Sequence, residues 1–389
     1  MDQIEGIISD PEVEGTGIKA ALNTLSQALA DFSASPYQET NANIVMNAFK
    51  GVTQVLNEYD ANLNTLMEQT KNDLSAAVTD INTKLDQLSE LNRSIAHEIF
   101  SNNDYDGVNY GPNDLLDQRN VILDDLSRYG DVQVTDLEDG KIQVKINGKV
   151  VVDASGASYT NDKLNIGSDG VTLTWNSNNQ NANLGAGAIR GFTDMLTGAD
   201  PINAGIPYYQ NKMDNFAQTL ADVFNNKIHA DDPDFPDKYK FLLQGGVDGK
   251  VTAGNISISD QWADDVSYII RKQNPDGELD NQDILDMKAA FEQDFNFGGE
   301  YTGTFSEFIT SVTNTLGSGI KTNSARMSAS LAIAESADSE RMGVSGVSLN
   351  EEGISMMTYN KAYQALGRLM TTMDEQLDMI INKMGIVGR

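Results

Sequence analysis

Apolar residues recur at alternating intervals of three and four positions along the C-terminal stretch from Leu349 to Met384. This spacing places them on one stripe of an α-helix, as at the a and d positions of a coiled coil. Ser348 and Glu351 predict a capping box at the start of the helix, and Gly385 is suited to ending it. The stripe, named the C-terminal seam, comprises Met356, Tyr359, Tyr363, Leu366, Met370, Met373, Leu377, Ile380 and Met384.

A long apolar stripe has to be covered by another helix, because exposed apolar surface is unfavourable in water. Periodicity alone does not separate an ordinary core helix from one that binds another molecule. Two features favour the second reading: the helix lies at the end of the sequence, and four of the nine seam residues are methionine. Methionine side chains are flexible and suit adaptable contacts. We therefore predict that the C-terminal seam is a partner-binding surface.

Helical spacing also dominates the first third of the chain. A helix is predicted from Ile18 to Phe32, ended by Ser35-Pro36, because the residue before a proline avoids the α conformation. A helix of about 60 residues without proline follows, from about Asn41 to Phe100. Asn92 falls on its apolar stripe, where it either fixes the pairing register or leaves the core position to Leu91.

The period changes from 3.6 to 2 at Gly130. Valine and isoleucine alternate with polar residues over 132–152, and Asn147-Gly148 is a strong signal for a hairpin turn. A second pair of strands is predicted at Lys163–Ile166 and Val171–Trp175. These patterns predict a small antiparallel β domain between helical segments.

The order of these patterns predicts an α+β fold, in which a long antiparallel helical bundle, or coiled-coil stalk, carries inserted small antiparallel β domains. Residues 1–16 are predicted to be a loosely structured acidic lead-in, and residues 241–297 to hold strands around Val251 and Ile256–Ile258 and a helix at Asp283–Phe295. The predicted segments are a helical stalk at 1–129, an inserted antiparallel β domain at 130–185, a returning stalk at 186–235, a mixed α/β insertion at 236–300, a further stalk at 301–342 and a C-terminal heptad helix segment at 343–389. Gly343–Val347, at the start of the last segment, is predicted to link the stalk to the C-terminal seam.

Composition excludes several classes of function. The 389 residues include 57 acidic and 27 basic side chains, so the formal net charge is −30. Nucleic acids and anionic membranes both require a basic face, and neither is expected as a partner. The absence of cysteine excludes disulfides and thiolate metal sites. The sequence shows no cleavable signal at Met1–Glu14 and no apolar run of the ~20 residues that a membrane helix needs.

Candidate catalytic and metal-binding motifs are incomplete. His97-Glu98 begins a zinc-protease pattern, but Ser101 stands where the second histidine is required, and His229 is the only other histidine. Two acidic turns resemble the start of a calcium loop. The first ends in Asn113 in place of the bidentate glutamate, and the second has Lys272 at the first ligand position. We predict no catalytic site, no cofactor and no metal.

Four stretches resemble motifs of one protein family. Val344–Glu352 is similar to S-G-V-[NS]-L-D-E-E, with Asn350 where aspartate is usual, and Tyr359–Ala365 resembles the Y-x-x-A-Y-Q-A core of a C-terminal rod–hook domain. Asn113–Arg119 matches the run N-D-L-L-D-Q-R, and Gly187–His229 resembles a helix that ends in N-x-x-H. On these motifs the chain resembles the flagellar axial proteins, and N-D-L-L-D-Q-R is typical of members at the junction between hook and filament.

The resemblance implies a structural subunit of the bacterial flagellum that joins hook to filament, and not an enzyme. It implies self-association into a ring, contacts with neighbouring hook and second junction proteins, and a flagellar export chaperone. It further implies an extracellular location in the flagellum, reached through the flagellar secretion system without a cleaved signal peptide.

One departure from the family pattern bears on the seam. Family members begin with an amphipathic helix containing an S-N-N-I-A-N-like motif, which pairs with the C-terminal helix, and this sequence has no such segment. We therefore expect the seam to lack a mate within the chain. Two alternatives stay open: another axial protein, hook-like or flagellin-like, and a cell-surface adhesin-like stalk. The adhesin would bind its ligand through the β insert, where Tyr159 and Trp175 are the obvious aromatic residues.

Overall fold

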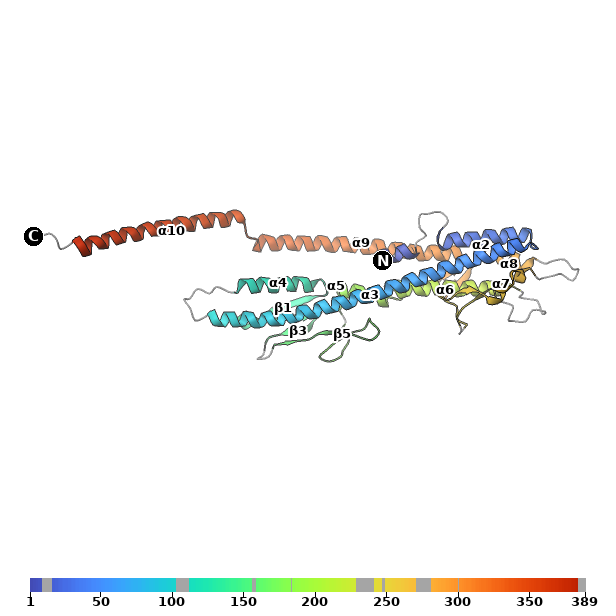
Figure 1. Ribbon diagram of the computed structural model, residues 1–389, viewed down its shortest axis with the longest axis horizontal. Helices are drawn as coiled ribbons and strands as arrows, with labels where there is room; N and C mark the ends of the chain where they lie inside the picture. The colour runs from blue at the N-terminus through green and yellow to red at the C-terminus, as the bar shows by residue number, and fades with distance from the viewer. Residues whose placement is uncertain are drawn as a thin grey trace, which may run out of the picture. The chain divides into compact units, whose positions relative to one another are not determined.

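The structure, a computed structural model shown in Figure 1, describes residues 1–8, 16–102, 112–155, 159–182, 184–228, 241–246, 249–270, 281–299 and 301–383. The chain divides into two compact units, unit 1 from Met1 to Ile320 and unit 2 from Lys321 to Arg389. Unit 1 combines long helices with small antiparallel sheets, and unit 2 is helical. The predicted α+β fold with a helical stalk and inserted β structure is confirmed.

Helix α3 (Glu39–Asn102) organises unit 1 by contributing to two hydrophobic cores in succession. Its 64 residues contain no proline, so nothing interrupts the backbone hydrogen bonds along its length. Apolar residues from Ala42 to Leu66 belong to the first core, and those from Leu74 to Leu88 belong to the second. Met67 packs against both cores. One helix thus carries both groups of smaller elements (Figure 1).

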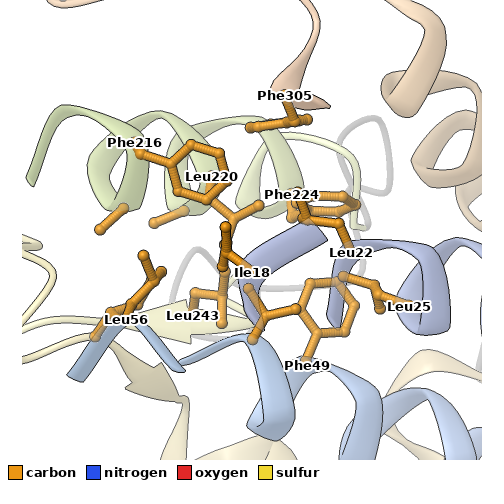
Figure 2. Close-up of a cluster of buried hydrophobic side chains, with 14 of the residues drawn as sticks. Ile18, Leu22, Leu25, Phe49, Leu56, Phe216, Leu220, Phe224, Leu243 and Phe305 are labelled. Carbon is orange, nitrogen blue, oxygen red and sulfur yellow. The ribbon is translucent and has the colours of Figure 1, made fainter. Parts of the chain in front are cut away.

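The first core is built mainly from helices. Ile18, Leu22 and Leu25 of one helix meet Phe49 and Leu56 of α3, while Phe216, Leu220 and Phe224 approach from another (Figure 2). The contributing helices are α1 (Asp2–Ile8), α2 (Gly17–Ala34), α6 (Ile206–Asn225) and the start of α9 (Phe305–Ser345). The predicted end of α2 before Ser35-Pro36 is confirmed. The loose lead-in was a wrong prediction at residues 2–8, because Ile4 and Ile8, one helical turn apart, are buried in this core.

The second core is a β layer packed against the later half of α3. A four-stranded antiparallel sheet has the order β1-β2-β3-β4, and β5 and β6 form a separate pair. The elements are α4 (Asn113–Ser127), β1 (Val132–Asp136), η1 (Glu138–Gly140), β2 (Ile142–Ile146), β3 (Lys149–Asp153), β4 (Thr160–Asn161), β5 (Leu164–Ile166), β6 (Leu173–Trp175) and α5 (Gly187–Thr197). The predicted antiparallel insert is therefore present, and α4 returns antiparallel beside α3 (Figure 1).

Two local features of this region follow directly from residue type. Asn147 and Gly148 connect β2 and β3 with φ values of 48° and 80°, which suit an Asn-Gly hairpin turn and confirm that prediction. Gly187 begins α5 with φ 76°, and a Cβ there would overlap the backbone of Tyr129 and Gly130. The glycine-rich start of α5 thus serves close packing against the end of α4, where the amide of Ala188 donates to the carbonyl oxygen of Arg128 at 2.9 Å.

Asparagine side chains attach strands to the long helices. The Asn92 Nδ2 donates to the Ile142 carbonyl at 2.8 Å, and its Oδ1 accepts from the Ile142 amide at 3.1 Å. Asn82 makes the same pair of bonds with Leu164, at 2.9 Å each. In each case the side-chain amide takes the place that a neighbouring strand would occupy. Of the two alternatives for the α3 stripe, Asn92 and not Leu91 is the fully buried residue.

Replacing Asn92 by aspartate is expected to destabilise the second core strongly. The carboxylate has no N–H to donate, so the Ile142 carbonyl loses its partner and a charge is buried beside it. An unsatisfied buried group costs about 1–3 kcal/mol, and more when a charge is involved. Urea unfolding at pH 7 measures the loss. Asn72→Asp, on an exposed position of the same helix, is the matched control; equal unfolding midpoints for the two variants would contradict the role of Asn92.

The region after α6 matches its prediction in part. The strand predicted around Ile256–Ile258 is confirmed by β8 (Ser257–Ile258), which pairs with β7 (Leu243–Gln244), whereas Val251 is buried outside any strand. The predicted helix ends early, because Phe295 and Phe297 alternate into a hairpin that turns at Gly298-Gly299 with φ 68° and 82°. The elements are α7 (Asp260–Asp264), η3 (Val266–Ile269), α8 (Gln282–Ala289), η4 (Ala290–Glu292), β9 (Phe295–Phe297) and β10 (Tyr301–Gly303).

Candidate assembly surface

Helix α9 changes from buried to exposed along its length. Its first turns present Phe305, Ile309 and Leu316 to the first core, where each is at most 1% exposed. From Lys321 onward the described side chains are exposed, including Met327 and Leu331. The predicted non-helical link at Gly343–Val347 is shorter than expected, because α9 continues to Ser345. The helix thus enters unit 2 with uncovered apolar side chains.

The C-terminal helix begins at the predicted N-cap, and Gly385, its predicted end, lies outside the described residues. The Glu351 amide donates to the Ser348 Oγ at 3.4 Å, so Ser348 is the N-cap of α10 (Leu349–Asp378). The regular α-helix then gives way to η5 (Met379–Lys383), which is a π-helical turn. A π turn has more residues per turn than an α-helix, so Ile380 departs from the heptad phase of the residues before it.

The described part of the C-terminal seam is exposed throughout. The eight residues from Met356 to Ile380 lie on α10 and η5 and are 50–79% exposed. Met384, the ninth, lies outside the described residues. At seven-residue intervals an α-helix advances by about two turns, so Met356, Tyr363, Met370 and Leu377 follow one slowly drifting stripe. The seven seam residues from Met356 to Leu377 therefore lie on one apolar stripe of α10, whereas Ile380 on η5 departs from it.

The exposed apolar surface of unit 2 is wider than the predicted seam. Further exposed apolar residues are Leu349, Ile354, Met357, Leu369, Met379 and Ile381 on α10 and η5, and Met327, Leu331, Ile333 and Met342 on α9. The sequence prediction missed them because it counted only the a and d positions of the C-terminal helix, although the high apolar content of these segments was visible in the sequence.

Charge is distributed unequally between the units. Residues 321–389 contain 8 acidic and 7 basic residues, whereas residues 1–320 contain 49 acidic and 20 basic residues. Nearly the whole net charge of −30 therefore belongs to unit 1. Copies of unit 2 meet little electrostatic repulsion, since like charges oppose close approach only where they are in excess.

Other candidate sites fare differently. Trp175 is buried, and Tyr159 lies under the Arg93 guanidinium at 5.3 Å, so neither provides the exposed aromatic cluster on which the adhesin alternative depends. His97 is exposed on α3, and His229 and most of both acidic turns lie outside the described residues. Within the described ranges no group of three or more histidine and carboxylate side chains is arranged to hold a metal ion. No helix in those ranges combines the length and the apolar character needed to cross a membrane.

Comparison with known proteins places these elements in a family. The sequence model of the "Flagellar hook-associated protein FlgK helical domain" matches residues 1–237, which include α1 to α6. The model of the "Flagellar basal body rod FlgEFG protein C-terminal" matches residues 339–383, which include α10 and η5. The segment that carries the described seam thus falls within the second match.

Known proteins resemble this chain over different shares of its length. "Flagellar hook-associated protein 1" of Bacillus subtilis (strain 168) is 25% identical over 425 residues, an alignment that covers the whole of this chain and 80% of the relative. The flagellar hook junction protein FlgK from Burkholderia pseudomallei is 20% identical with a TM-score of 0.44, over 58% of this chain and 40% of that chain. Because the FlgK helical-domain model matches more than half of its residues, the protein belongs to the flagellar hook-associated protein FlgK family.

Proposed function

We propose that the C-terminal seam is the surface through which this protein joins its neighbours in the flagellum. As a FlgK family member, the protein is a structural subunit of the external flagellum that joins hook to filament and associates with other axial components. In this proposal, apolar contact along the seam binds one subunit to its neighbour.

The exposure of the seam carries this proposal. Eight described apolar side chains, each at least half exposed, lie along α10 and η5. Burying one Leu- or Met-sized side chain contributes about 1.5–3 kcal/mol, which exceeds the 0–1 kcal/mol typical of a surface ion pair. Contact along several turns therefore also offsets the entropy lost when the helix is fixed against a neighbour. The small net charge of unit 2 favours such contact between copies.

Several finer assignments belong to the same proposal. The neighbours are further copies of the chain arranged as a ring, together with hook protein and a second junction protein. Before assembly an export chaperone covers the C-terminal region, and export proceeds through the flagellar secretion system without a cleaved signal peptide. The role is structural and involves no catalysis. The family membership and the apolar C-terminal surface support these assignments.

Single cysteines test whether the seam faces a neighbour. The sequence has no cysteine, so Met370→Cys introduces one reactive thiol, on the seam. A short bismaleimide is expected to convert the assembled variant to a covalent dimer, which denaturing gels detect. Thr372→Cys places the thiol two residues away, about 200° around the helix, and is the matched control. Equal cross-linking of the two variants would show that the seam is not the contacting face.

A further inference from the structure

A groove separates α3 from the returning helix α4. The helices are joined on one side of it by Lys84, whose Nζ lies 3.0 Å from the Asp125 Oδ2. That hydrogen bond raises the pKa of Lys84 and lowers the pKa of Asp125, so the pair is charged at neutral pH. On α4, Arg119 donates from Nη1 to the Gly140 carbonyl at 2.6 Å and thereby contacts η1. The first contact links α3 and α4 directly, and the second links α4 to η1, which packs against α3.

The groove, named the α3–α4 groove, has a cavity volume of about 580 Å³. This volume is in the range of sites that take a ligand side chain or small molecule. Val121 is 60% exposed, whereas most apolar residues of α3 that face the β layer are buried. The apolar lining residues are Leu91, Val121 and Ile122, and the polar ones are Gln87, Glu90, Ser94, Asp117 and Gln118.

The polar side chains of the groove form no bonds within the described part of the fold. None of the five makes a hydrogen bond or ion pair with another residue that the structure describes. The face of α3 toward the β layer is different: Asn82 and Asn92 bind strand backbone, and Asp86 bonds to both Asn161 and Lys163. One face of α3 thus holds the insert with its polar groups, and the groove face keeps its groups available.

The run Asn113–Arg119, which matches the family motif N-D-L-L-D-Q-R, also contains both a side chain that bonds within the fold and side chains that face the groove. Arg119 serves the fold through its bond to Gly140. Asp117 and Gln118 line the groove beside Glu90 and Gln87 of α3. A structural role therefore accounts for Arg119, whereas the side chains of Asp117 and Gln118 bond to no other described residue of unit 1.

We propose that the α3–α4 groove docks a basic amphipathic helix of another protein. An apolar side chain of that helix would contact Leu91, Val121 and Ile122, while its lysine or arginine residues would pair with Glu90 and Asp117. Helices pack by placing the ridges of one into the groove between others, so a pair of parallel walls suits a third helix. The excess of 29 acidic charges in unit 1 attracts a basic partner and opposes a second copy of unit 1 at this position.

A pair of synthetic helices tests the groove on the full chain. The probe is a fluorescein-labelled helix-forming peptide with leucine on one face and lysine on the other, and its counterpart has glutamate in place of lysine. Fluorescence anisotropy is expected to show binding of the lysine peptide only. Hydrogen exchange is expected to slow at residues 87–94 and 117–122. Val121→Asp is expected to weaken binding about tenfold or more, because it removes apolar contact and places a carboxylate in the floor.

Ile44→Asp is the matched control, since Ile44 is a half-exposed apolar residue on α3 that does not line the groove. It adds the same charge and is expected to leave the affinity within about twofold. Equal affinity of the two variants would attribute binding to net charge alone and overturn the proposal, as would absence of binding. A change in self-association of Val121→Asp would assign the groove to a second copy and would also overturn it. The Met370→Cys cross-link is expected to persist in Val121→Asp, which separates this inference from the function of the seam.

Discussion

Replacing Leu366 and Met373 together by aspartate is expected to abolish association through unit 2 while the monomer stays folded. Both side chains lie on the seam and are more than half exposed, so neither contributes to a core. In a seam contact each contributes about 1.5–3 kcal/mol, and the new carboxylates add a desolvation cost. The concentration needed for association is therefore expected to rise about 100-fold or more. Sedimentation velocity over a concentration series measures it.

A second double variant isolates the position of the charges from their number. Gln364→Asp with Thr371→Asp adds the same two carboxylates, also seven residues apart, about 200° around α10 from Leu366 and Met373. This variant is expected to associate nearly as the parent protein does. The circular dichroism of both variants is expected to match the parent, because all four positions are exposed. Association of the Leu366 and Met373 variant at the parent concentration would refute the assignment of the seam.

Phe305→Ala is expected to cause the largest loss of folding stability among these variants. Phe305 is fully buried at the first residue of α9, and its ring lies 5.3–6.2 Å from the rings of Phe216, Phe224, Phe291, Phe295 and Phe297. Removing a buried phenylalanine costs about 3–5 kcal/mol, since transfer energy is lost and a cavity remains. The start of the helix that leads to unit 2 is held by this residue.

Tryptophan fluorescence measures this loss of stability in the first core, which contains Phe305. Trp262 lies in the first core, 5.3 Å from Phe49, and Trp175 lies in the second. Urea unfolding followed by Trp262 emission in a Trp175→Phe background therefore reports on the region around Phe305. Leu331→Ala, on the exposed part of the same helix, is expected to change the free energy of unfolding by no more than about 0.5 kcal/mol. A similar small change for Phe305→Ala would refute its anchoring role.

The 64-residue helix α3 was predictable from the sequence, because many residues contribute to its periodic pattern. The hairpin at Asn147-Gly148 and the N-cap at Ser348 were also predictable, because these residue types favour those particular backbone geometries. Short elements were not, since a few residues carry little periodic signal. Helix α1 has only seven residues, and its acidic composition concealed the buried pair Ile4 and Ile8. The strand predicted around Val251 is absent, because an apolar residue can be buried in a core without belonging to a strand.

The candidate surfaces show the same division. The residues of the seam could be predicted from their spacing. Their exposure could not, because an exposed apolar stripe and a buried one have the same spacing. The α3–α4 groove was not predictable. Its two walls, around Glu90 and Asp117, come from different helices, and their approach depends on the return of α4 and on the contact between Lys84 and Asp125. The π turn at η5 has no signal in apolar spacing either, because it changes the backbone and leaves the order of residues unaltered.

The side-chain amides of Asn82 and Asn225 have a consequence for crowded conditions. The pairs β5–β6 and β7–β8 each contain only two strands, and unpaired strand edges are templates for adding strands from other chains. Asn82 occupies the peptide group of Leu164, and Asn225 bonds to the amide and carbonyl of Leu243, at one edge of each ribbon. At high protein concentration these two edges therefore cannot offer the Leu164 and Leu243 peptide groups to a strand of another molecule, which lowers the tendency to aggregate by edge-to-edge pairing.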